Sequence, residues 1–210
     1  MGIIEKNTVP AKEQTAKNAY IVDNGGNYNV LFLGNSITWH GPKEDIGWTK
    51  NCGMAASAKE KDYVHVAVGL LEQRFGKVNY AVVSASSWES AYYRDDVFEN
   101  FEVARNFPAD VIVIRLGENL WSASEHFSTH PISLSLEKLI EYICGERKPK
   151  VIVTDLFWKN QLIDEEIHLV AEKKAYAFVS INDLGEREEN MAIGQYAHAG
   201  ICYHPNYNGM

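Results

Sequence analysis

Short apolar runs alternate with longer amphipathic stretches along the chain from residue 28 onwards. Each run is only as long as a buried strand, and the runs predict strands at residues 30–33, 78–84, 111–116, 151–156 and 177–181. The stretches between them repeat apolar side chains at helical spacing, as Val66, Leu70 and Leu71 do on one face of residues 53–75. Further helices are predicted around residues 89–105, 134–144 and 161–176.

This alternation predicts right-handed crossovers and a parallel sheet that helices cover on both faces. We therefore expect an α/β fold of three layers (α/β/α), with a doubly wound, flavodoxin-like parallel sheet of about five strands. Residues 28–210 are predicted to form a single domain, because 210 residues are enough for one large core. The polar residues 1–27 are predicted to form an N-terminal arm or a small added strand.

The first predicted strand stops abruptly at Gly34-Asn35-Ser36. A serine at this point places a hydroxyl in the crevice outside the carboxyl edge of the sheet, where open α/β folds bind ligands. Gly34 permits a backbone conformation that other residues resist, and it lets a substrate approach closely. The same residues are also typical of a turn that only caps the next helix, so this motif alone leaves both interpretations open.

Two later motifs favour a catalytic serine. Residues 115–119 read Arg-Leu-Gly-Glu-Asn after the third predicted strand, and residues 204–206 read His-Pro-Asn near the C-terminus. A serine and a histidine far apart in sequence suit a nucleophile and its base. With Gly-Asn-Ser in place of Gly-Asp-Ser, the three motifs in this order resemble those of the SGNH (GDSL-type) hydrolases. The resemblance runs from about residue 28 to the end of the chain.

The resemblance implies a carboxylic ester hydrolase that needs no cofactor or metal, with Ser36 as nucleophile and His204 as general base and then acid. It also implies an oxyanion site made by the Asn119 side chain, the Ser36 backbone N–H and a third backbone N–H after the second strand. The family has a glycine at this third position, whereas residues 84–87 read Ser-Ala-Ser-Ser. We assign the donor to Ser86; the other interpretation is an ordinary loop in which Ser87 caps a helix.

The sequence departs from the family at two further places. Ile201 stands where the family has an aspartate, three residues before the histidine. Either a backbone carbonyl orients His204, or a carboxylate comes from elsewhere, with Glu118 and Asp183 as candidates. The family also continues into a closing helix, whereas this sequence stops at residue 210, so the helix is either truncated or absent. These departures favour an alternative, a catalytically silent protein of the same fold that binds a glycan or a protein partner.

Aromatic side chains gather after the predicted strands. The predicted substrate-binding residues are Trp39, His40, Trp88 and Trp121, and Trp158 follows the fourth strand. Tryptophan rings at a sheet edge can stack on a sugar ring, with Glu89 or Arg115 bonding its hydroxyls, although they can equally be core. A lipase would line its entrance with aliphatic side chains, so we expect a short acyl group, such as acetyl, on a carbohydrate.

Composition narrows the partners further. The chain has 20 basic and 28 acidic side chains and a formal net charge of −8, which argues against nucleic acid or an anionic membrane as partner. No apolar run approaches the roughly 20 residues of a membrane span. The first residues lack signal-peptide architecture, so a cytoplasmic location is the default, and a secreted or periplasmic one applies if a leader was removed. The expected partner is a small-molecule or glycan ester, and the oligomeric state stays open.

Two other classes of site find little support. Cys52, Cys144 and Cys202 are widely scattered, and no helix-spaced histidine pair supports a metal site built from His126 and His130 with a later histidine. Residues 34–36 lack the further glycines and the Gly-Lys-Ser/Thr ending of a phosphate loop. A flavodoxin-like nucleotide binder is therefore less favoured than either an ester hydrolase or a catalytically silent protein of the same fold.

Overall fold

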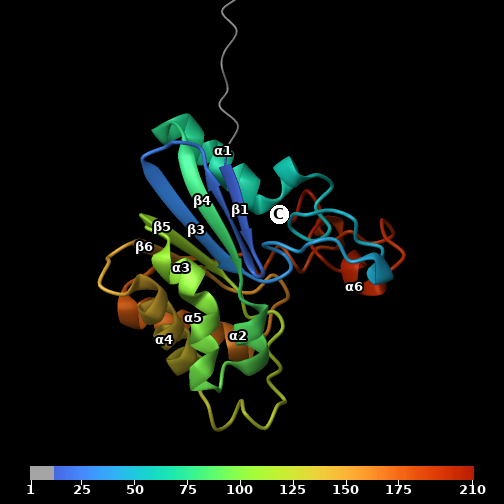
Figure 1. Cartoon of the computed structure of the whole chain (residues 1–210). Coiled ribbons are helices and arrows are strands. Elements are labelled where there is room, and N and C mark those ends of the chain that lie inside the picture. Colours follow the sequence, from blue (N-terminus) through green and yellow to red (C-terminus); the bar gives the residue numbers. More distant parts are fainter. Residues whose placement is uncertain (1–11) are drawn as a thin grey trace, which may run out of the picture.

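The computed structural model of the chain describes residues 12–210 and has a seven-stranded sheet at its centre (Figure 1). The strands are β1 (Lys12–Ala16), β2 (Ala19–Asp23), β3 (Tyr28–Gly34), β4 (Val78–Ser84), β5 (Val111–Arg115), β6 (Lys150–Thr154) and β7 (Ala177–Val179). Their order in the sheet is β1-β2-β4-β3-β5-β6-β7, and all neighbours from β4 to β7 are parallel. The predicted doubly wound parallel α/β sheet is confirmed.

The first two strands extend this sheet at the β4 edge. β1 and β2 form an antiparallel hairpin, and β2 pairs antiparallel with β4. The hairpin forms because side chains alternate between the two faces of β2: Tyr20 and Val22 pack on one side, and Ala19 and Ile21 on the other. The predicted N-terminal arm of residues 1–27 thus contains two strands of the sheet, β1 and β2. Residues 1–11 of this arm lie outside the described part of the chain.

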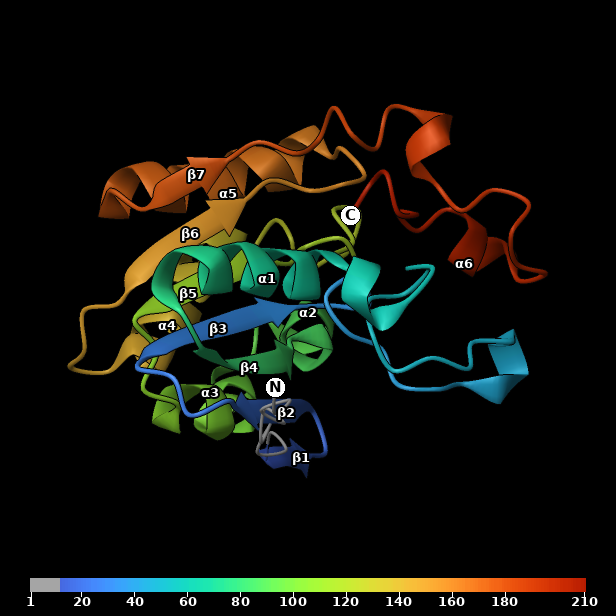
Figure 2. The same ribbon diagram turned by 90° about the horizontal axis from the view of Figure 1, so that it is seen from above.

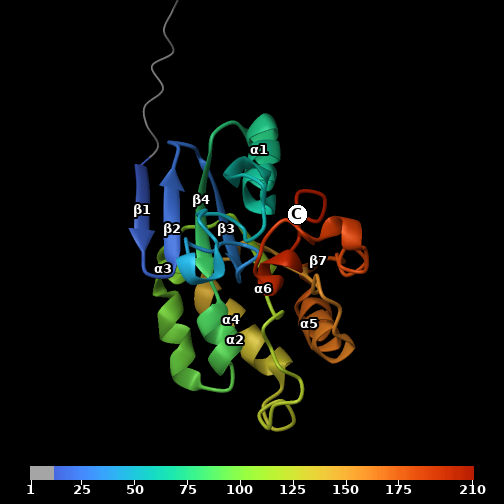
Figure 3. The same ribbon diagram turned by 90° about the vertical axis from the view of Figure 1, so that its right-hand side faces the viewer.

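Helices cover both faces of the sheet (Figures 2 and 3). They are α1 (Tyr63–Phe75), α2 (Ser86–Ala91), α3 (Glu102–Asn106), α4 (Ile132–Cys144), α5 (Gln161–Lys174) and α6 (Ala199–Cys202). Helices α2 to α5 share one apolar core with the sheet, and α1 packs on the opposite face. The single long helix predicted near residues 89–105 is instead α2, a 3-10 segment and α3.

The packed face of α1 differs in part from the predicted one. Val64 and Val68 are buried against the sheet and Leu71 packs half-buried beside them, whereas Val66 and Leu70 are exposed. Both sets have helical spacing, so periodicity alone could not choose between them. The helix also begins later than predicted, after Asp62, whose side chain accepts a hydrogen bond from the His65 backbone N–H.

The ends of three central strands lie side by side. Gly34, the last residue of β3, is in register with Ser84 on β4 and with Arg115 on β5. The loops that follow these strands therefore leave the sheet at one edge, and the C-terminal segment reaches the same end of the molecule (Figure 2). A Cβ at Gly34 would collide with the Thr38 side chain and the Arg115 carbonyl, which explains why glycine stands there.

Candidate active site

Ser36 and His204 meet at the carboxyl edge of the sheet. Ser36 Oγ lies 2.8 Å from His204 Nε2, although the two residues are 168 positions apart in the chain. The serine sits in a tight turn after β3, in which the backbone N–H groups of Thr38 and Trp39 each donate to the Asn35 carbonyl at 3.0 Å. The turn lifts the serine hydroxyl out of the strand and toward the histidine.

A backbone carbonyl orients the histidine. His204 Nδ1 lies 2.7 Å from the Gly200 carbonyl oxygen, which can only accept a hydrogen bond. Nδ1 must therefore carry the proton, and Nε2 is left as the acceptor for the Ser36 hydroxyl. Of the two arrangements that the sequence left open, the structure contains the carbonyl one. Glu118 and Asp183 instead lie next to Arg115 and Arg187, at 3.1 and 3.8 Å.

The surroundings of His204 keep its imidazole neutral. Burial lowers the pKa of His204 to about 4, and the nearby positive charge of Arg115 acts in the same direction. The Trp158 ring packs edge-on against the imidazole with centroids 5.1 Å apart, and its Nε1 donates to the Tyr203 carbonyl at 3.0 Å. A neutral imidazole is the form that can accept a proton from a serine. Ile201, at the position of the family's aspartate, is buried in a small apolar cluster.

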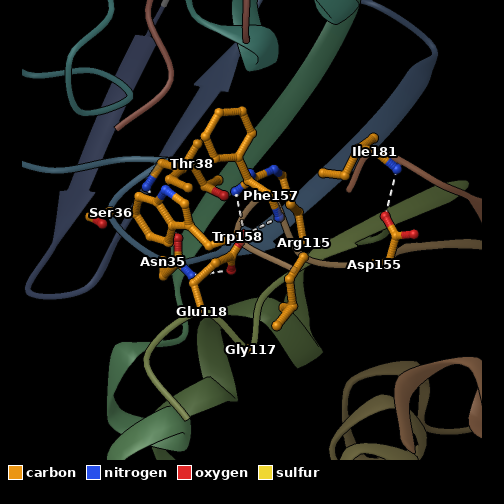
Figure 4. Close-up of polar contacts among 12 residues, drawn as sticks. Asn35, Ser36, Thr38, Arg115, Gly117, Glu118, Asp155, Phe157, Trp158 and Ile181 are labelled. Carbon is orange, nitrogen blue, oxygen red and sulfur yellow. Dashed lines mark hydrogen bonds and ion pairs between the residues drawn. The ribbon is translucent and has the colours of Figure 1, made fainter. Parts of the chain in front are cut away.

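Two buried carboxylates lie directly behind Ser36. The Asn35 side-chain Nδ2 donates to Glu89 Oε1 at 2.9 Å and to Glu118 Oε2 at 2.6 Å. Figure 4 shows Glu118 between Asn35 and Arg115, with a dashed line to each. Glu89 and Arg115 are both buried in this network, although Glu89 also contributes to the wall of the cavity described below, so their bonds to sugar hydroxyls stay a prediction. This network could not be predicted from the sequence, because no motif joins three segments that are distant in the chain.

Asn119 is tied to the same network. Its Nδ2 donates to Glu89 Oε2 at 2.6 Å, and the backbone N–H of Gly117 donates to Glu89 Oε1 at 2.6 Å. Gly117 has a φ of +125°, which L side chains rarely adopt, so the Gly-x-Asn spacing has a conformational cause. An amide nitrogen carries two N–H groups, and one of those on Asn119 remains for another acceptor.

The third expected oxyanion donor lies at the start of α2. Ser86 is the first residue of this helix, and backbone N–H groups in a first helical turn have no partner within the helix. The neighbouring Ala85 N–H is committed to the Gly34 carbonyl at 2.6 Å. Ser87 does not cap α2, since the capping position is Ala85, which makes no side-chain bond. The alternative reading of Ser87 as a cap is therefore wrong.

The predicted substrate-binding residues have different surroundings in the structure. Trp88 is fully buried and donates through Nε1 to Ser135 Oγ at 3.0 Å, so its prediction as a binding residue is wrong. Trp39 packs edge-on against Tyr20, with centroids 5.4 Å apart. His40 Nδ1 lies 2.6 Å from the Gly41 carbonyl. Trp88 is buried because it lies on the inner face of α2. The position of a tryptophan just after a strand does not reveal which face of the following helix it occupies.

Trp121 lines a cavity beside Asn119. This cavity has a volume of about 540 Å³, and Glu89, Tyr93 and His126 also contribute to its wall. Trp121 is 71% exposed, and the rings of Tyr93 and His126 stack with centroids 3.7 Å apart. The cavity thus combines flat aromatic faces with polar groups next to the loop that carries Asn119.

Residues 12–210 contain no group of three or more His, Cys, Asp or Glu side chains placed to hold a metal ion. Among the helices described in that range, none is both long and apolar enough to span a membrane.

Comparison with one solved structure supports the fold. The chain is similar to a solved structure from Parabacteroides merdae ATCC 43184, described as a GDSL-like lipase, with a TM-score of 0.50 and 17% sequence identity over 88% of this chain and 90% of that one. A second solved structure aligns with a TM-score of 0.46 and 12% identity, covering 83% of this chain and 91% of that one. No family model matches the sequence, and no curated protein matches it.

Proposed function

We propose that this protein is a serine hydrolase of the SGNH type that cleaves a carboxylic ester. The observation that carries the proposal is the contact between Ser36 Oγ and His204 Nε2 at 2.8 Å, with the opposite ring nitrogen held by the Gly200 carbonyl. Hydrogen bonding at both nitrogens selects the tautomer that a general base requires. The similarity in fold to a GDSL-like lipase is consistent with this chemistry.

In the proposed reaction, Ser36 Oγ attacks the ester carbonyl carbon while His204 Nε2 takes the hydroxyl proton. The tetrahedral intermediate collapses to an acyl-serine, and His204 returns the proton to the departing alcohol. Water then attacks the acyl-serine with His204 again as base, which releases the acid and restores the serine. The Gly200 carbonyl is neutral, so it orients the ring but stabilises the imidazolium less than a carboxylate would.

Developing negative charge on the substrate oxygen requires preorganised donors. We assign this role to the second N–H of Asn119 together with the backbone N–H groups of Ser36 and Ser86. Losing one such donor typically costs about 2.7–4 kcal/mol of barrier. The positions of Gly117 and Glu89 around Asn119 support the assignment, because they leave the amide little freedom to turn.

For the substrate we propose a short acyl group, such as acetyl, on a carbohydrate. The cavity beside Asn119 offers the rings of Tyr93 and Trp121, which suit the apolar face of a sugar. Its wall also carries the hydroxyls of Ser90 and Ser124. Such a wall suits an alcohol component with several hydroxyls better than an aliphatic chain.

The decisive experiment compares turnover of p-nitrophenyl acetate and p-nitrophenyl octanoate by the wild type, Ser36→Ala and His204→Ala. We expect acetate to be preferred, and each substitution to lower kcat by at least ~10³-fold. Ser57→Ala and His168→Ala are matched controls, since both side chains are exposed and neither is assigned a role in the reaction. Thermal unfolding of each variant verifies that the loss is not a loss of fold.

A catalytically silent protein that binds a glycan or a protein partner is the second candidate. The observation that favours it is the neutral carbonyl at His204 Nδ1, because a triad aspartate is worth about 10⁴-fold in turnover. If wild type and both variants hydrolyse neither ester, while the wild type still binds acetylated oligosaccharides, this second function replaces the first.

A further inference from the structure

Glu89 is a buried carboxylate that the proposed reaction does not use. It belongs to α2, is only 3% exposed, and accepts three hydrogen bonds, from Asn35 Nδ2, the Gly117 backbone N–H and Asn119 Nδ2. Its three partners come from the loops after β3 and β5. Burying a carboxylate is costly, so three converging donors on one such group call for an explanation beyond packing.

We propose that Glu89, in its ionised form, is a positioning residue that fixes the Asn119 amide with its nitrogen end toward the oxyanion. This inference rests on the proposed function and adds a residue that acts through another. The Asn119 side chain can face the substrate with either its oxygen or its nitrogen, and only the nitrogen end stabilises a negative charge. An acceptor-only carboxylate 2.6 Å from Nδ2 selects that end.

The other two bonds hold Glu89 itself in place. Oε1 receives the Gly117 N–H at 2.6 Å and the Asn35 Nδ2 at 2.9 Å, so both carboxylate oxygens are occupied by donors. Oε1 already accepts two hydrogen bonds, so a proton would go to Oε2, the oxygen that holds Asn119. The arrangement therefore favours the carboxylate form, and protonation of Glu89 weakens the acceptor that anchors Asn119.

The charges around Glu89 determine when this happens. Burial, and next the negative charge of Glu118, raise the pKa of Glu89 above its usual range. Arg115 is paired with Glu118 at 3.1 Å rather than with Glu89. On the cavity side, the titratable neighbours are Tyr92, Tyr93, Glu125 and His126. Activity should consequently fall as the pH drops through the raised pKa of Glu89, before His204 takes up a proton near pH 4.

The test is the isosteric substitution Glu89→Gln, assayed with p-nitrophenyl acetate. Glutamine replaces one acceptor oxygen by an NH2 group, which sets a donor against a donor. We expect kcat to fall by ~10²–10³-fold, the loss typical of one oxyanion donor, with KM little changed. The acid limb of the pH profile should move down toward pH 4, where His204 itself takes up a proton. Glu99→Gln, on an exposed glutamate, is the matched control.

Asn119→Ala provides an independent measurement, because Asn119 is exposed and its truncation leaves the core intact. If Glu89 acts through Asn119, this variant also moves the acid limb toward pH 4, and the double variant is no slower than Asn119→Ala alone. The proposal is overturned if the wild type shows Ser36-dependent turnover while Asn119→Ala keeps the wild-type acid limb. It is equally overturned if folded Glu89→Gln keeps the wild-type kcat. Absence of Ser36-dependent turnover in the wild type would instead refute the proposed function itself.

Discussion

At the scale of single residues, the site depends on groups whose protonation or conformation is unusual. Burial keeps the His204 imidazole neutral. Gly117, two residues before Asn119 in the same loop, has a φ of +125°. The low pKa of His204 costs stability only at pH values below its ordinary value of 6.5, and the φ of Gly117 strains any residue other than glycine. Both therefore have consequences for stability that can be measured without any substrate.

The pKa of His204 predicts a pH-dependent stability. The folded value of about 4 lies below the ordinary value of 6.5, so between these pH values the unfolded chain binds a proton that the folded one does not. Lowering the pH from about 6.5 to about 4 should thus destabilise the wild type relative to His204→Gln. Urea unfolding of both proteins across this range measures the difference. Parallel curves would show that His204 is not buried as described.

The backbone of Gly117 predicts a second loss of stability. In Gly117→Ala the alanine would have to adopt a positive φ, and its Cβ would press against the Leu156 side chain. We expect the free energy of unfolding to fall by about 1–3 kcal/mol, as is typical of a strained conformation. Gly145→Ala is an instructive comparison, because its φ is also positive but its Cβ would have open space. A smaller loss at Gly117 than at Gly145 would contradict this account.

At the scale of elements, the short helix α2 carries two side chains of opposite purpose. Trp88 faces the sheet and fills the core beneath α4, whereas Glu89 turns toward the loops after β3 and β5. Successive helical positions are about 100° apart, so neighbours in sequence can serve core and site separately. The helix therefore couples the packing of the core to the position of Asn119.

Comparison of two tryptophans tests this division. Trp88→Ala removes a fully buried side chain and should lower the free energy of unfolding by about 3–5 kcal/mol. Trp121→Ala changes an exposed ring and should leave stability nearly unchanged, while raising KM for an acetylated sugar several-fold. Phe75→Ala controls for loss of an exposed ring, since Phe75 stacks on Tyr28 at the far end of β3. An unchanged KM in Trp121→Ala would show that the cavity lined by Trp121 does not bind the substrate.

At the scale of the whole molecule, the site exists only because the C-terminal segment folds back over the sheet edge. Residues Met191 and Pro205 form a bridge, and the Ala192 N–H donates to the His204 carbonyl at 3.0 Å. Asn206 fastens the segment further, since its Nδ2 donates to the carbonyls of Glu189 and Met191 at 2.8 and 2.7 Å. These contacts set the position of the imidazole relative to Ser36.

Asn206→Ala should therefore impair catalysis at a distance. Losing both side-chain donors loosens the loop that carries His204, and we expect kcat for p-nitrophenyl acetate to fall about tenfold or more. Asn208→Ala is the matched control, because Asn208 is exposed and its side-chain Nδ2 donates to the same Glu189 carbonyl at the longer distance of 3.4 Å. Equal activity of the two variants would show that the loop does not depend on Asn206.

The alternation of strands and helices, and with it the doubly wound parallel sheet, follows from the apolar pattern of the chain. The sequence also predicted Ser36, Asn119 and His204 as the residues of a site, through the resemblance of their three ordered motifs to those of the SGNH hydrolases. The strands, helices and turns could be predicted because apolar periodicity and turn residues act within a few positions.

The tertiary structure alone decided which groups surround those residues. The Gly200 carbonyl behind His204, the buried Glu89 that joins Asn35 to Asn119, and the burial of Trp88 all depend on contacts between distant segments. No local pattern encodes such contacts, because a helix face or a loop can turn toward the core or the site without changing its periodicity. The aligned ends of β3, β4 and β5, together with the C-terminal segment that packs against them, bring these groups together.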